Sequence, residues 1–356
     1  MMSQSPPEEF SRIPEEEIFR RIADAKRRRG EELCILGHYY ERDEVVRFAD
    51  HQGDSFELAK AGAATRARWI VFCGVRFMAE ASVILSRPGQ RVFLPDMDAG
   101  CPLSDMAAAD QVEAAWASLE EAGVAGDFVP VTYMNSSAEL KAFCGRRGGM
   151  VCTSSSARRA FERVFEEGKR LFFFPDENLG LNTLRAIAGG EEAGAAIWDP
   201  YAARGGVDSA RLQSDKALLW KGHCHVHTFF SKEHVSAARV SYPGCSVIVH
   251  PECRPEVVEA ADGSGSTSFI KDFAESAAAG STVVIGTEIN MVSRLAKAMP
   301  EKRIVPLASS TCPNMYRISP AKLLWTLENL GEVNEIFVPE DVVFDAKAAL
   351  DRMLAL

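Results

Sequence analysis

Three cysteines stand in loop-like surroundings, beside Gly, Pro or His, where a thiol could bind a metal: Cys101 in DAGCPLSD, Cys224 in KGHCHVH and Cys312 in SSTCPNM. If the three thiolates met, they would hold a [4Fe-4S] cluster with one iron lacking a cysteine ligand, or a zinc ion with one open position. Both centres would offer a Lewis-acid site, so both indicate catalysis. By number alone, three ordinary buried cysteines would be an equally good interpretation. The loop positions favour metal binding.

The chain around Cys224 also carries three histidines at alternate positions, His223, His225 and His227. In an extended segment, successive side chains point to opposite sides, so the three imidazoles would lie opposite the Cys224 thiol. They could not then all bind one ion together with that thiol. We expect His227 to face a substrate instead.

Polar triplets end three apolar runs of the chain, and each is followed by a hydroxyl residue ahead of a helix-like stretch. The three sets are His38-Tyr39-Tyr40 with Ser55, Tyr133-Met134-Asn135 with Ser154, and His250-Pro251-Glu252 with Thr267. The triplet starts 17 residues before the hydroxyl in the first and third sets and 21 residues before it in the second. The surplus of four matches the polar Arg146-Arg147-Gly148-Gly149. This spacing predicts an internal repeat.

Each repeat closes on one of the three loop cysteines. The separation is 63 residues from His38 to Cys101, 91 from Tyr133 to Cys224 and 62 from His250 to Cys312. Most of the surplus in the second repeat fits residues 186–214, which are rich in Gly and Ala and typical of a surface excursion. We therefore expect three homologous α/β units with one cysteine each.

Short apolar runs alternate with helix-like stretches, which is typical of α/β folds with parallel sheets. Nine runs are the expected strands: LCILGHYY, WIVFCG, RVFLPD, FVPVTYMNS, MVCTSS, LFFFPD, SVIVHPE, TVVIGTE and RIVPLAS. The polar triplets follow such strands at their carboxyl ends, where open α/β sheets bind ligands. Three units around a pseudo-threefold axis could direct all three triplets at one cavity.

The predicted domain plan follows from the repeat. It has an N-terminal helical segment over residues 1–30 and a first α/β repeat over residues 31–110. The second repeat covers residues 111–231, with its insertion at about 186–214, and the third repeat with the C-terminal helices covers residues 232–356. Within the N-terminal segment, EEEIFRRIADAKRRR has the acids before the bases and one amphipathic face, as expected of a surface helix.

The remaining six of the nine cysteines do not share the loop pattern. Five of them lie inside strand-like runs or have no counterpart in the other repeats, and we expect core or surface thiols there: Cys34, Cys73, Cys144, Cys152 and Cys245. Cys253 follows the third triplet and is a weaker candidate for the cavity, because the other repeats hold nothing equivalent.

Length and composition describe an ordinary folded chain of more than one domain. The chain has 356 residues, of which 47% are apolar and 25% charged, near the averages of globular proteins. Its net charge of -10 argues against nucleic acid or an anionic membrane surface as the main partner. No stretch is apolar enough to span a membrane, and the N-terminal segment lacks the apolar region of an export signal, so we expect a cytoplasmic location.

The chain resembles the quinolinate synthase family, the A proteins of NAD biosynthesis, in eleven motifs that occur in family order from about residue 30 to 330: HYYERDEVVRFADHQGDS, VFCGVRFMAEAS, LPDMDAGCPLSD, TYMNSSAE, VCTSSSA, FPDENLG, KGHCHVH, HPECRPEV, GSTS, GTEINM and CPNM. The resemblance implies three homologous α/β/α sandwich domains with parallel sheets around a pseudo-threefold axis, and a [4Fe-4S] cluster at the centre. It also implies condensation of iminoaspartate with dihydroxyacetone phosphate to quinolinate, with release of phosphate and two waters. An L-aspartate oxidase or dehydrogenase would supply the iminoaspartate.

The same resemblance assigns roles to residues of the repeats. The cluster ligands would be Cys101, Cys224 and Cys312, and the iron without a cysteine ligand would bind the substrate. Tyr40 would be the acid/base tyrosine and Glu252 the catalytic carboxylate. His38 and His250 would be catalytic histidines of the cavity. The residues that contact the substrates would be His38, Ser55, Tyr133, Asn135, Ser154, His250, Glu252 and Thr267.

The bare chemistry asks for the same residue types. Condensation and elimination need a proton acceptor for the carbon acid, a proton donor for the departing hydroxide and a group that polarises the hydroxyl. Ser55, Ser154 and Thr267 each precede a helix, whose N-terminal N–H groups can bind phosphate or carboxylate without a basic side chain. Each residue also has a plainer interpretation: the hydroxyls as N-caps, the tyrosines as packing aromatics and Glu252 as a helix-initiating acid.

Two other classes of function are possible on the residues alone. One is an iron-sulfur sensor or carrier, against which the acid-base residues and the lack of a DNA-binding motif argue. The other is a zinc-dependent hydrolase or lyase on the same three thiolates. The sequence also departs from the family twice. The insertion at about 186–214 is longer than usual, and CPNM lacks the upstream cysteines of some relatives, which argues against a redox-switching dithiol there.

Overall fold

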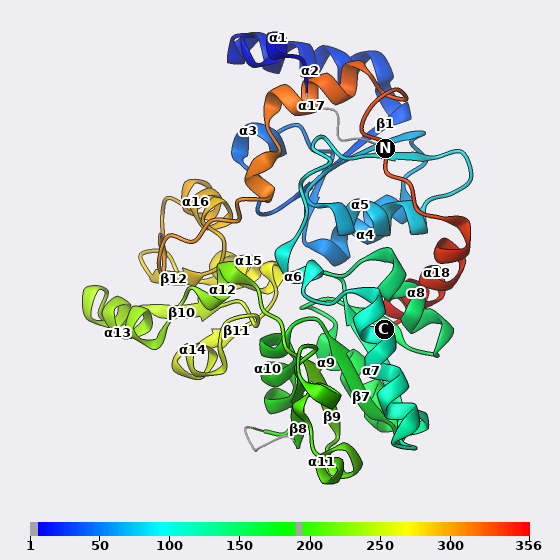
Figure 1. Ribbon diagram of the computed structural model, residues 1–356. Helices are drawn as coiled ribbons and strands as arrows, with labels where there is room; N and C mark the ends of the chain where they lie inside the picture. Colours follow the sequence, from blue (N-terminus) through cyan, green and yellow to red (C-terminus); the bar gives the residue numbers. More distant parts are fainter. Residues whose placement is uncertain (1–5, 190–193) are drawn as a thin grey trace.

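The strands form three separate parallel sheets with helices on both sides, so the predicted α/β fold of three units is confirmed (Figure 1). The structure is a computed structural model that describes residues 6–189 and 194–356. All nine strands expected from apolar runs are present in it. The central strands, such as β1 and β3, are buried along their whole length, as expected of parallel strands covered on both faces, and this is why they read as continuous apolar runs.

The first unit holds the sheet β2-β1-β3-β4. Its strands are β1 (Leu33–His38), β2 (His51–Gly53), β3 (Trp69–Cys73) and β4 (Arg91–Phe93), and its helices are α3 (Asp43–Val46), α4 (Ser55–Ala64), α5 (Arg76–Leu85) and α6 (Pro102–Asp105). Ahead of it lie α1 (Glu8–Ser11), α2 (Glu15–Arg29) and the 3-10 turn η1 (Gly30–Glu32). The predicted N-terminal helix is α2, and it buries one face through Ile18, Ile22 and Ala25.

The second unit holds the sheet β6-β5-β7-β9-β8. Its strands are β5 (Phe128–Tyr133), β6 (Met150–Cys152), β7 (Arg170–Phe174), β8 (Ala195–Trp198) and β9 (Ala217–Trp220). Its helices and 3-10 turns are α7 (Ala109–Glu121), η2 (Ala125–Asp127), α8 (Ala138–Arg146), α9 (Ala157–Glu166), α10 (Glu177–Ile187), η3 (Ala203–Gly206), α11 (Ser209–Ser214) and α12 (His225–Thr228). Without β8, the strand order is that of the first sheet.

The third unit repeats that order as β11-β10-β12-β13. Its strands are β10 (Ser246–Val249), β11 (Gly263–Ser264), β12 (Thr282–Gly286) and β13 (Arg303–Pro306). Its helices are α13 (Lys232–Ser241), α14 (Pro255–Ala260), α15 (Thr267–Ser276) and α16 (Ile289–Ala298), and the chain ends with η4 (Met315–Arg317), α17 (Pro320–Glu328) and α18 (Glu340–Leu354). The common order in three sheets is the structural counterpart of the repeat in the sequence.

Four strands lie outside the expected set: β2, β8, β9 and β11. β2 and β11 are edge strands of only three and two residues, HQG and GS, and they carry no apolar run. One of the helix-like stretches between the expected strands, DEVVRFADHQGDSFELAKAG, is not helical throughout, because β2 lies between α3 and α4. β9 is an apolar run of four residues, too short to stand out in the sequence, yet all four residues are buried. Pairing with a neighbouring strand, which the sequence does not display, defines these elements.

The insertion at about 186–214 is not simply a surface excursion. It begins in the last turn of α10 and contains β8, which pairs in parallel with β9 from Ala195 opposite Ala217 to Trp198 opposite Trp220. Residues 190–193 of the insertion lie outside the described residues. Trp198 is 3% exposed and covers Gly205, where a Cβ would lie 2.2 Å from the indole. The insertion therefore widens the middle sheet by one strand.

The last helices of the chain pack against the first two units. α17 lies beside α2, and α18 lies against α8 and α5 (Figure 1). Between them the chain joins the edge of the first sheet, where the backbone N–H of Ile336 donates to the carbonyl of Val92 at 2.9 Å. The C-terminal helices thus share a hydrophobic core with the first and second sheets. The residue boundaries of the three domains stay a prediction.

Gly145 lets α18 approach α8 closely. A Cβ at this position would lie 1.9 Å from the carbonyl oxygen of Asp345. We expect Gly145→Ala to push the two helices apart and to lower the free energy of unfolding by about 1–3 kcal/mol, as overpacking generally does. Thermal unfolding measures the loss. Gly126→Ala is the matched control, because a Cβ there meets no atom within 4 Å; equal stability of the two variants would contradict the prediction.

The described helices include none that is both long and apolar enough to cross a membrane.

Candidate active site

One cavity collects all thirteen residues that the sequence analysis singled out. It lies at the carboxyl ends of the strands, where the three units face one another. Its lining includes the three loop cysteines, the first and third residues of each triplet, the three hydroxyl residues and His227: Cys101, Cys224, Cys312, His38, Tyr40, Tyr133, Asn135, His250, Glu252, Ser55, Ser154, Thr267 and His227. The predicted convergence on a central cavity therefore occurs, while the roles of the individual residues stay predictions.

Two histidines of the cavity are held in one tautomer by the backbone. Nδ1 of His38 accepts the N–H of Tyr40 at 3.2 Å, and Nδ1 of His250 accepts the N–H of Glu252 at 3.3 Å. A backbone N–H can only donate, so the proton of each neutral ring is on Nε2. Burial lowers the pKa of both His38 and His250 to about 3. Both rings are thus neutral at physiological pH and can offer one Nε2–H donor.

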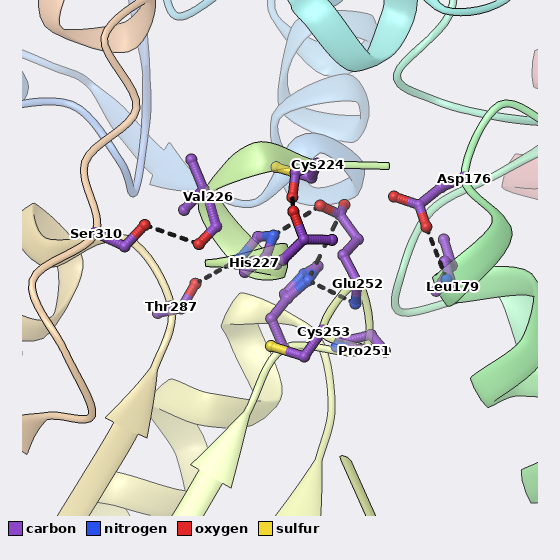
Figure 2. A network of polar contacts seen from close by, with 12 residues as sticks. Asp176, Leu179, Cys224, Val226, His227, Pro251, Glu252, Cys253, Thr287 and Ser310 are labelled. Carbon is purple, nitrogen blue, oxygen red and sulfur yellow. Dashed lines mark hydrogen bonds and ion pairs between the residues drawn. The ribbon is translucent and has the colours of Figure 1, made fainter. Parts of the chain in front are cut away.

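A chain of hydrogen bonds links the tyrosines of the first and second units, and Figure 2 shows the middle of this chain, Glu252, His227 and Thr287. The hydroxyl of Tyr133 donates to Oε1 of Glu252 at 2.5 Å, and Nδ1 of His227 lies 2.7 Å from Oε2 of the same carboxylate. Nε2 of His227 lies 3.1 Å from Oγ1 of Thr287, which in turn lies 2.8 Å from the hydroxyl of Tyr40. Protons can therefore move between Tyr40 and Glu252 without entering bulk water.

Thr287 is the member of this chain that the sequence analysis missed. It is fully buried and follows β12 within the motif GTEINM. The signal was present, because Thr287 stands at the carboxyl end of a strand in the third repeat. A threonine next to a glutamate does not by itself indicate a role. Its contact with His227, sixty residues earlier in the chain, appears only in the folded structure.

Charge in the network is concentrated on Glu252. Burial by itself raises the pKa of this carboxyl, but contact with His227 and the hydrogen bonds from His227 and Tyr133 outweigh it and hold the pKa at about 2. Burial and the nearby Glu252 raise the pKa of Tyr40 and Tyr133 well above 10. The site thus combines an ionised carboxylate with neutral phenols.

The segment around Cys224 is helical, which corrects the expected alternation of its histidines. The chain turns into α12 directly after Cys224, and the N–H of His227 donates to the Cys224 carbonyl at 3.1 Å. In a helical turn, residues three apart share a face. Cys224 and His227 therefore both reach the cavity; the exposed His225 also lines it, whereas the exposed His223 does not. His227 meets Glu252, as Figure 2 shows.

The three loop cysteines are partly exposed, whereas the other six cysteines are buried. Cys101 and Cys224 each stand immediately before a short helix, α6 and α12, and Cys312 precedes η4. Backbone N–H groups lie against the sulfurs of Cys101 and Cys312 and favour the thiolate, yet burial prevails and raises the pKa to about 12 for Cys101 and about 11 for Cys312. A metal would have to displace these protons on binding.

This donor set fits a cluster held by three cysteines. One thiol comes from each unit, all three line one cavity, and the backbone N–H groups at Cys101 and Cys312 suit thiolate sulfur. Cys253, the weaker candidate, is fully buried, and its sulfur faces the carbonyl of Gly286 at 3.9 Å. A second, mixed set consists of Cys224, His227 and Glu252, whose ligand atoms lie within 4.8 Å of one another.

The three cavity hydroxyls are not the helix N-caps. Asp54 caps α4 and Ser266 caps α15, so Ser55 and Thr267 are the first residues of their helices. Ser154 lies in a turn in which Ser156 bonds the N–H of Thr153 at 2.9 Å, and α9 follows. Neighbouring side chains cap α4 and α15, and α9 has no side-chain cap, so the hydroxyls of Ser55, Ser154 and Thr267 are free to face the cavity.

Fold and site together define a class of protein. It is an α/β enzyme built from three repeats, with thiols and acid-base groups gathered in one central cavity. Comparison with known proteins supplies the particular family. The family model for the quinolinate synthetase A protein matches residues 20–355. The chain belongs to the quinolinate synthase family and is an enzyme of NAD biosynthesis, as the motifs predicted.

Full-length relatives agree with this assignment. Quinolinate synthase of Acidobacterium capsulatum is 49% identical over 352 residues, which cover 97% of this chain and 94% of the relative. Quinolinate synthase of Corynebacterium glutamicum is also 49% identical, over 357 residues that cover 98% of this chain and 90% of the relative. Quinolinate synthase of Haloarcula marismortui is 43% identical over 362 residues, with 100% of this chain and 96% of the relative covered.

Proposed function

We propose that the enzyme condenses iminoaspartate with dihydroxyacetone phosphate to give quinolinate, phosphate and two waters. The single observation that carries the proposal is the convergence of three thiols and an acid-base network from three units on one cavity, in a chain of this family. An L-aspartate oxidase or dehydrogenase would supply iminoaspartate, which is an unstable imine.

Cys101, Cys224 and Cys312 would hold a [4Fe-4S] cluster, with one iron free of cysteine. When bound, the cluster would supply a Lewis-acidic iron that polarises an oxygen of the substrate. The partial exposure of these three thiols to the cavity supports this assignment, because a cluster that takes part in chemistry must contact the substrate.

Glu252 and His227 act as one acid-base pair. The carboxylate accepts the Nδ1–H of His227 and thereby directs Nε2 toward Thr287 and the Tyr40 hydroxyl, which lies 3.3 Å away. A carboxylate that orients an imidazole in this way stabilises the protonated ring when it takes up a proton. Tyr40, whose phenol keeps its proton, would donate it to the departing hydroxide.

Neutral donors bind the acidic substrates. His38 and His250 each offer an Nε2–H, and Ser55, Ser154 and Thr267 offer hydroxyls close to helix N-termini, where backbone N–H groups favour phosphate and carboxylate. Tyr133 and Asn135 complete the substrate-binding wall. A protein with net charge -10 can thus bind two anions without a lysine or arginine in the lining of this cavity.

The test is an anaerobic assay of reconstituted protein with iminoaspartate and dihydroxyacetone phosphate, in which quinolinate, iron and sulfide are measured on the same sample. About four irons per chain with quinolinate formation is the expected result for one cubane cluster. A full cluster without product would overturn the proposed reaction and favour a sensor or a different substrate.

A zinc-dependent hydrolase or lyase is the second candidate, and the set of Cys224, His227 and Glu252 is the observation that favours it, since zinc accepts sulfur, nitrogen and oxygen ligands. Against it, Nδ1 of His227 and Oε2 of Glu252 bond to each other. Metal analysis of the purified protein decides: about one zinc per chain and no sulfide would favour this candidate.

Tyr40→Phe is expected to lower kcat by about 10²–10³, within the range of a lost general acid, and to leave the iron content unchanged. The phenylalanine ring keeps the packing against His38, whose ring centre lies 4.8 Å away, and removes only the hydroxyl. Quinolinate formation at saturating substrate measures the effect. Tyr39→Phe is the matched control at the neighbouring position, and unchanged turnover in Tyr40→Phe would remove Tyr40 from the mechanism.

A further inference from the structure

In each unit, one side chain bonds both backbone carbonyls that flank the third residue of the polar triplet. In the first unit this side chain is Arg294 of α16. Its Nη1 donates to the carbonyl of Tyr39 at 3.0 Å, and its Nη2 donates to the carbonyl of Glu41. The residue between these two carbonyls is Tyr40, so the guanidinium fixes the backbone on both sides of the proposed acid.

Lys141 of α8 does the same in the second unit. Its Nζ donates to the carbonyl of Met134 at 3.0 Å and to the carbonyl of Ser136 at 2.5 Å, on either side of Asn135. The side chain of Lys141 is fully buried. Burying an ammonium group is costly unless its donors are used, so a lysine here is explained by the carbonyls it bonds.

Asn182 of α10 completes the set in the third unit. Its Nδ2 donates to the carbonyls of Pro251 and Cys253, both at 2.8 Å, and Glu252 stands between them. The amide is 7% exposed. Three chemically different side chains thus make the same pair of contacts at equivalent places in the repeat.

The origin of these side chains links the units to one another. Asn182 and Arg294 each lie six residues after the residue that caps their helix, Asp176 and Glu288. Asn182, from the second unit, serves the loop of the third, and Arg294, from the third unit, serves the loop of the first. The equivalent position in the first unit is Ala81, six residues after the N-cap Val75 of α5, and it offers no donor.

The second loop is therefore served from within its own unit by Lys141. Glu80, the neighbour of Ala81, still reaches that unit, because its Oε2 accepts the N–H of Ala138 at 3.2 Å. Each unit therefore contacts the next one around the cavity: the first contacts the second, the second the third and the third the first. Only the donor for the second loop differs, because it comes from α8 of the same unit and not from α5 of the first unit.

We propose that Arg294, Lys141 and Asn182 are positioning residues for Tyr40, Asn135 and Glu252. The proposal rests on the proposed function for its kinetic consequences. Two carbonyls held on either side of a residue restrict its φ and ψ and hence the direction of its side chain. A displacement of about 1 Å in a catalytic group can cost about a hundredfold in rate, so a small change in these loops has a large effect.

Two variants separate positioning from stability. Asn182→Leu removes both donors next to the acid-base pair and is expected to lower kcat by about ten- to a hundredfold with little change in KM. Lys141→Met removes the donors next to the substrate contact Asn135 and is expected to raise KM by about tenfold with a smaller change in kcat. If Asn182→Leu does not accumulate as folded protein, Asn182→Ala replaces it, because it also removes both donors and the same loss of kcat is expected.

Matched controls exist for both changes. Lys302 also donates from Nζ to two carbonyls, those of Ala274 at 2.8 Å and Glu275 at 2.6 Å, but at the end of α15. Asn329 donates from Nδ2 to the carbonyl of Trp325 at 2.8 Å in α17. Lys302→Met and Asn329→Leu should lower stability without changing kcat or KM. Equal kinetic losses in the controls would show that the effect is general destabilisation and would overturn the proposal.

Hydrogen-deuterium exchange gives a readout that needs no turnover. The amide of Cys253 donates to the carbonyl of His250 at 3.0 Å, so it is protected in the intact loop. In Asn182→Leu, the peptide that carries residues 250–253 should exchange at least about tenfold faster, and in Asn329→Leu it should not. Unchanged exchange overturns the proposal. If the wild-type enzyme makes no quinolinate, the proposed function fails, whereas the exchange result still decides whether these side chains hold the loops.

Discussion

Replacing Cys312 by serine will remove the iron and sulfide from the protein and lower quinolinate formation by at least about a thousandfold, since Lewis-acid catalysis is worth several kcal/mol. Serine keeps the size of the side chain but replaces a soft thiolate by a hydroxyl, which is a poor ligand for iron-sulfur clusters. The same result is expected for Cys101→Ser and Cys224→Ser, because each unit contributes one thiol to the cavity. Iron and sulfide analysis and the visible absorbance of the cluster measure the first effect, and the anaerobic assay measures the second.

The control for this series is Cys245→Ala. Cys245 is buried in the third unit, where its sulfur lies 3.9 Å from the carbonyl of Ala238. Loss of the sulfur there should cost stability only, as for a small core side chain, with iron content and turnover retained. A normal cluster in any of the three serine variants would show that the corresponding cysteine is not a ligand. Complete loss of iron in Cys245→Ala would show that the iron content reports only on folding, and the serine variants would then not identify the ligands.

Glu252→Gln is expected to lower kcat by about 10²–10⁴ while the iron content and KM change little. The amide has nearly the same shape as the carboxylate, but it cannot hold a negative charge beside His227. Tyr133 and His227 both donate to this side chain, and an amide nitrogen placed against either donor leaves one hydrogen bond unmade. The imidazole then loses its preferred tautomer, and Nε2 no longer accepts a proton from the side of Tyr40.

Steady-state kinetics over a range of both substrates separates kcat from KM for this variant. Glu256→Gln is the matched control, since Glu256 is an exposed carboxylate four residues further along, in α14. Its variant should keep wild-type kcat. If Glu252→Gln retained kcat, the pair of Glu252 and His227 would not be the acid-base unit; if it lost iron instead, its role would be to support the metal site.

Both predictions depend on groups whose types the sequence displays and whose contacts it does not. The repeat of polar triplets, hydroxyls and cysteines shows that Cys101, Cys224 and Cys312 occupy equivalent places. Equivalence in a parallel α/β repeat is enough to expect a common cavity, because strand ends point the same way in every unit. For this reason thirteen of the residues that line the cavity could be predicted from the sequence, whereas apolar lining residues such as Val75, Phe77 and Met315 could not.

Local conformation was less predictable where it depends on a partner. β2 and β11 are strands only because β1 and β10 lie beside them, and β8 is a strand because β9 provides an edge. The alternation expected for GHCHVH was wrong, because a turn of helix after Cys224 reorders its side chains. A few residues of polar or mixed character carry too weak a periodicity to choose between strand, helix and loop.

By itself, the sequence determined the three-unit α/β plan, the family and thirteen of the residues at the cavity. The plan and the candidate residues follow from periodicity and from spacing along the chain, and the family follows from the resemblance of the motifs and their order. Only the tertiary structure decided which of these residues touch. Tyr40, His227 and the pair of Glu252 and Thr287 come from the first, second and third units, and their order in the hydrogen-bonded network follows from packing.

The contacts that Arg294, Lys141 and Asn182 make with the loops were also decided only by the tertiary structure. Nothing in the sequence around Asn182 or Arg294 indicates that each bonds the loop of another unit. A side chain that donates hydrogen bonds to backbone carbonyls needs only N–H donors at the right distance. Arginine, lysine and asparagine can all do this, so these contacts have no sequence motif. Such contacts are set by how helices pack across units, and for that physical reason they are visible only in the folded molecule.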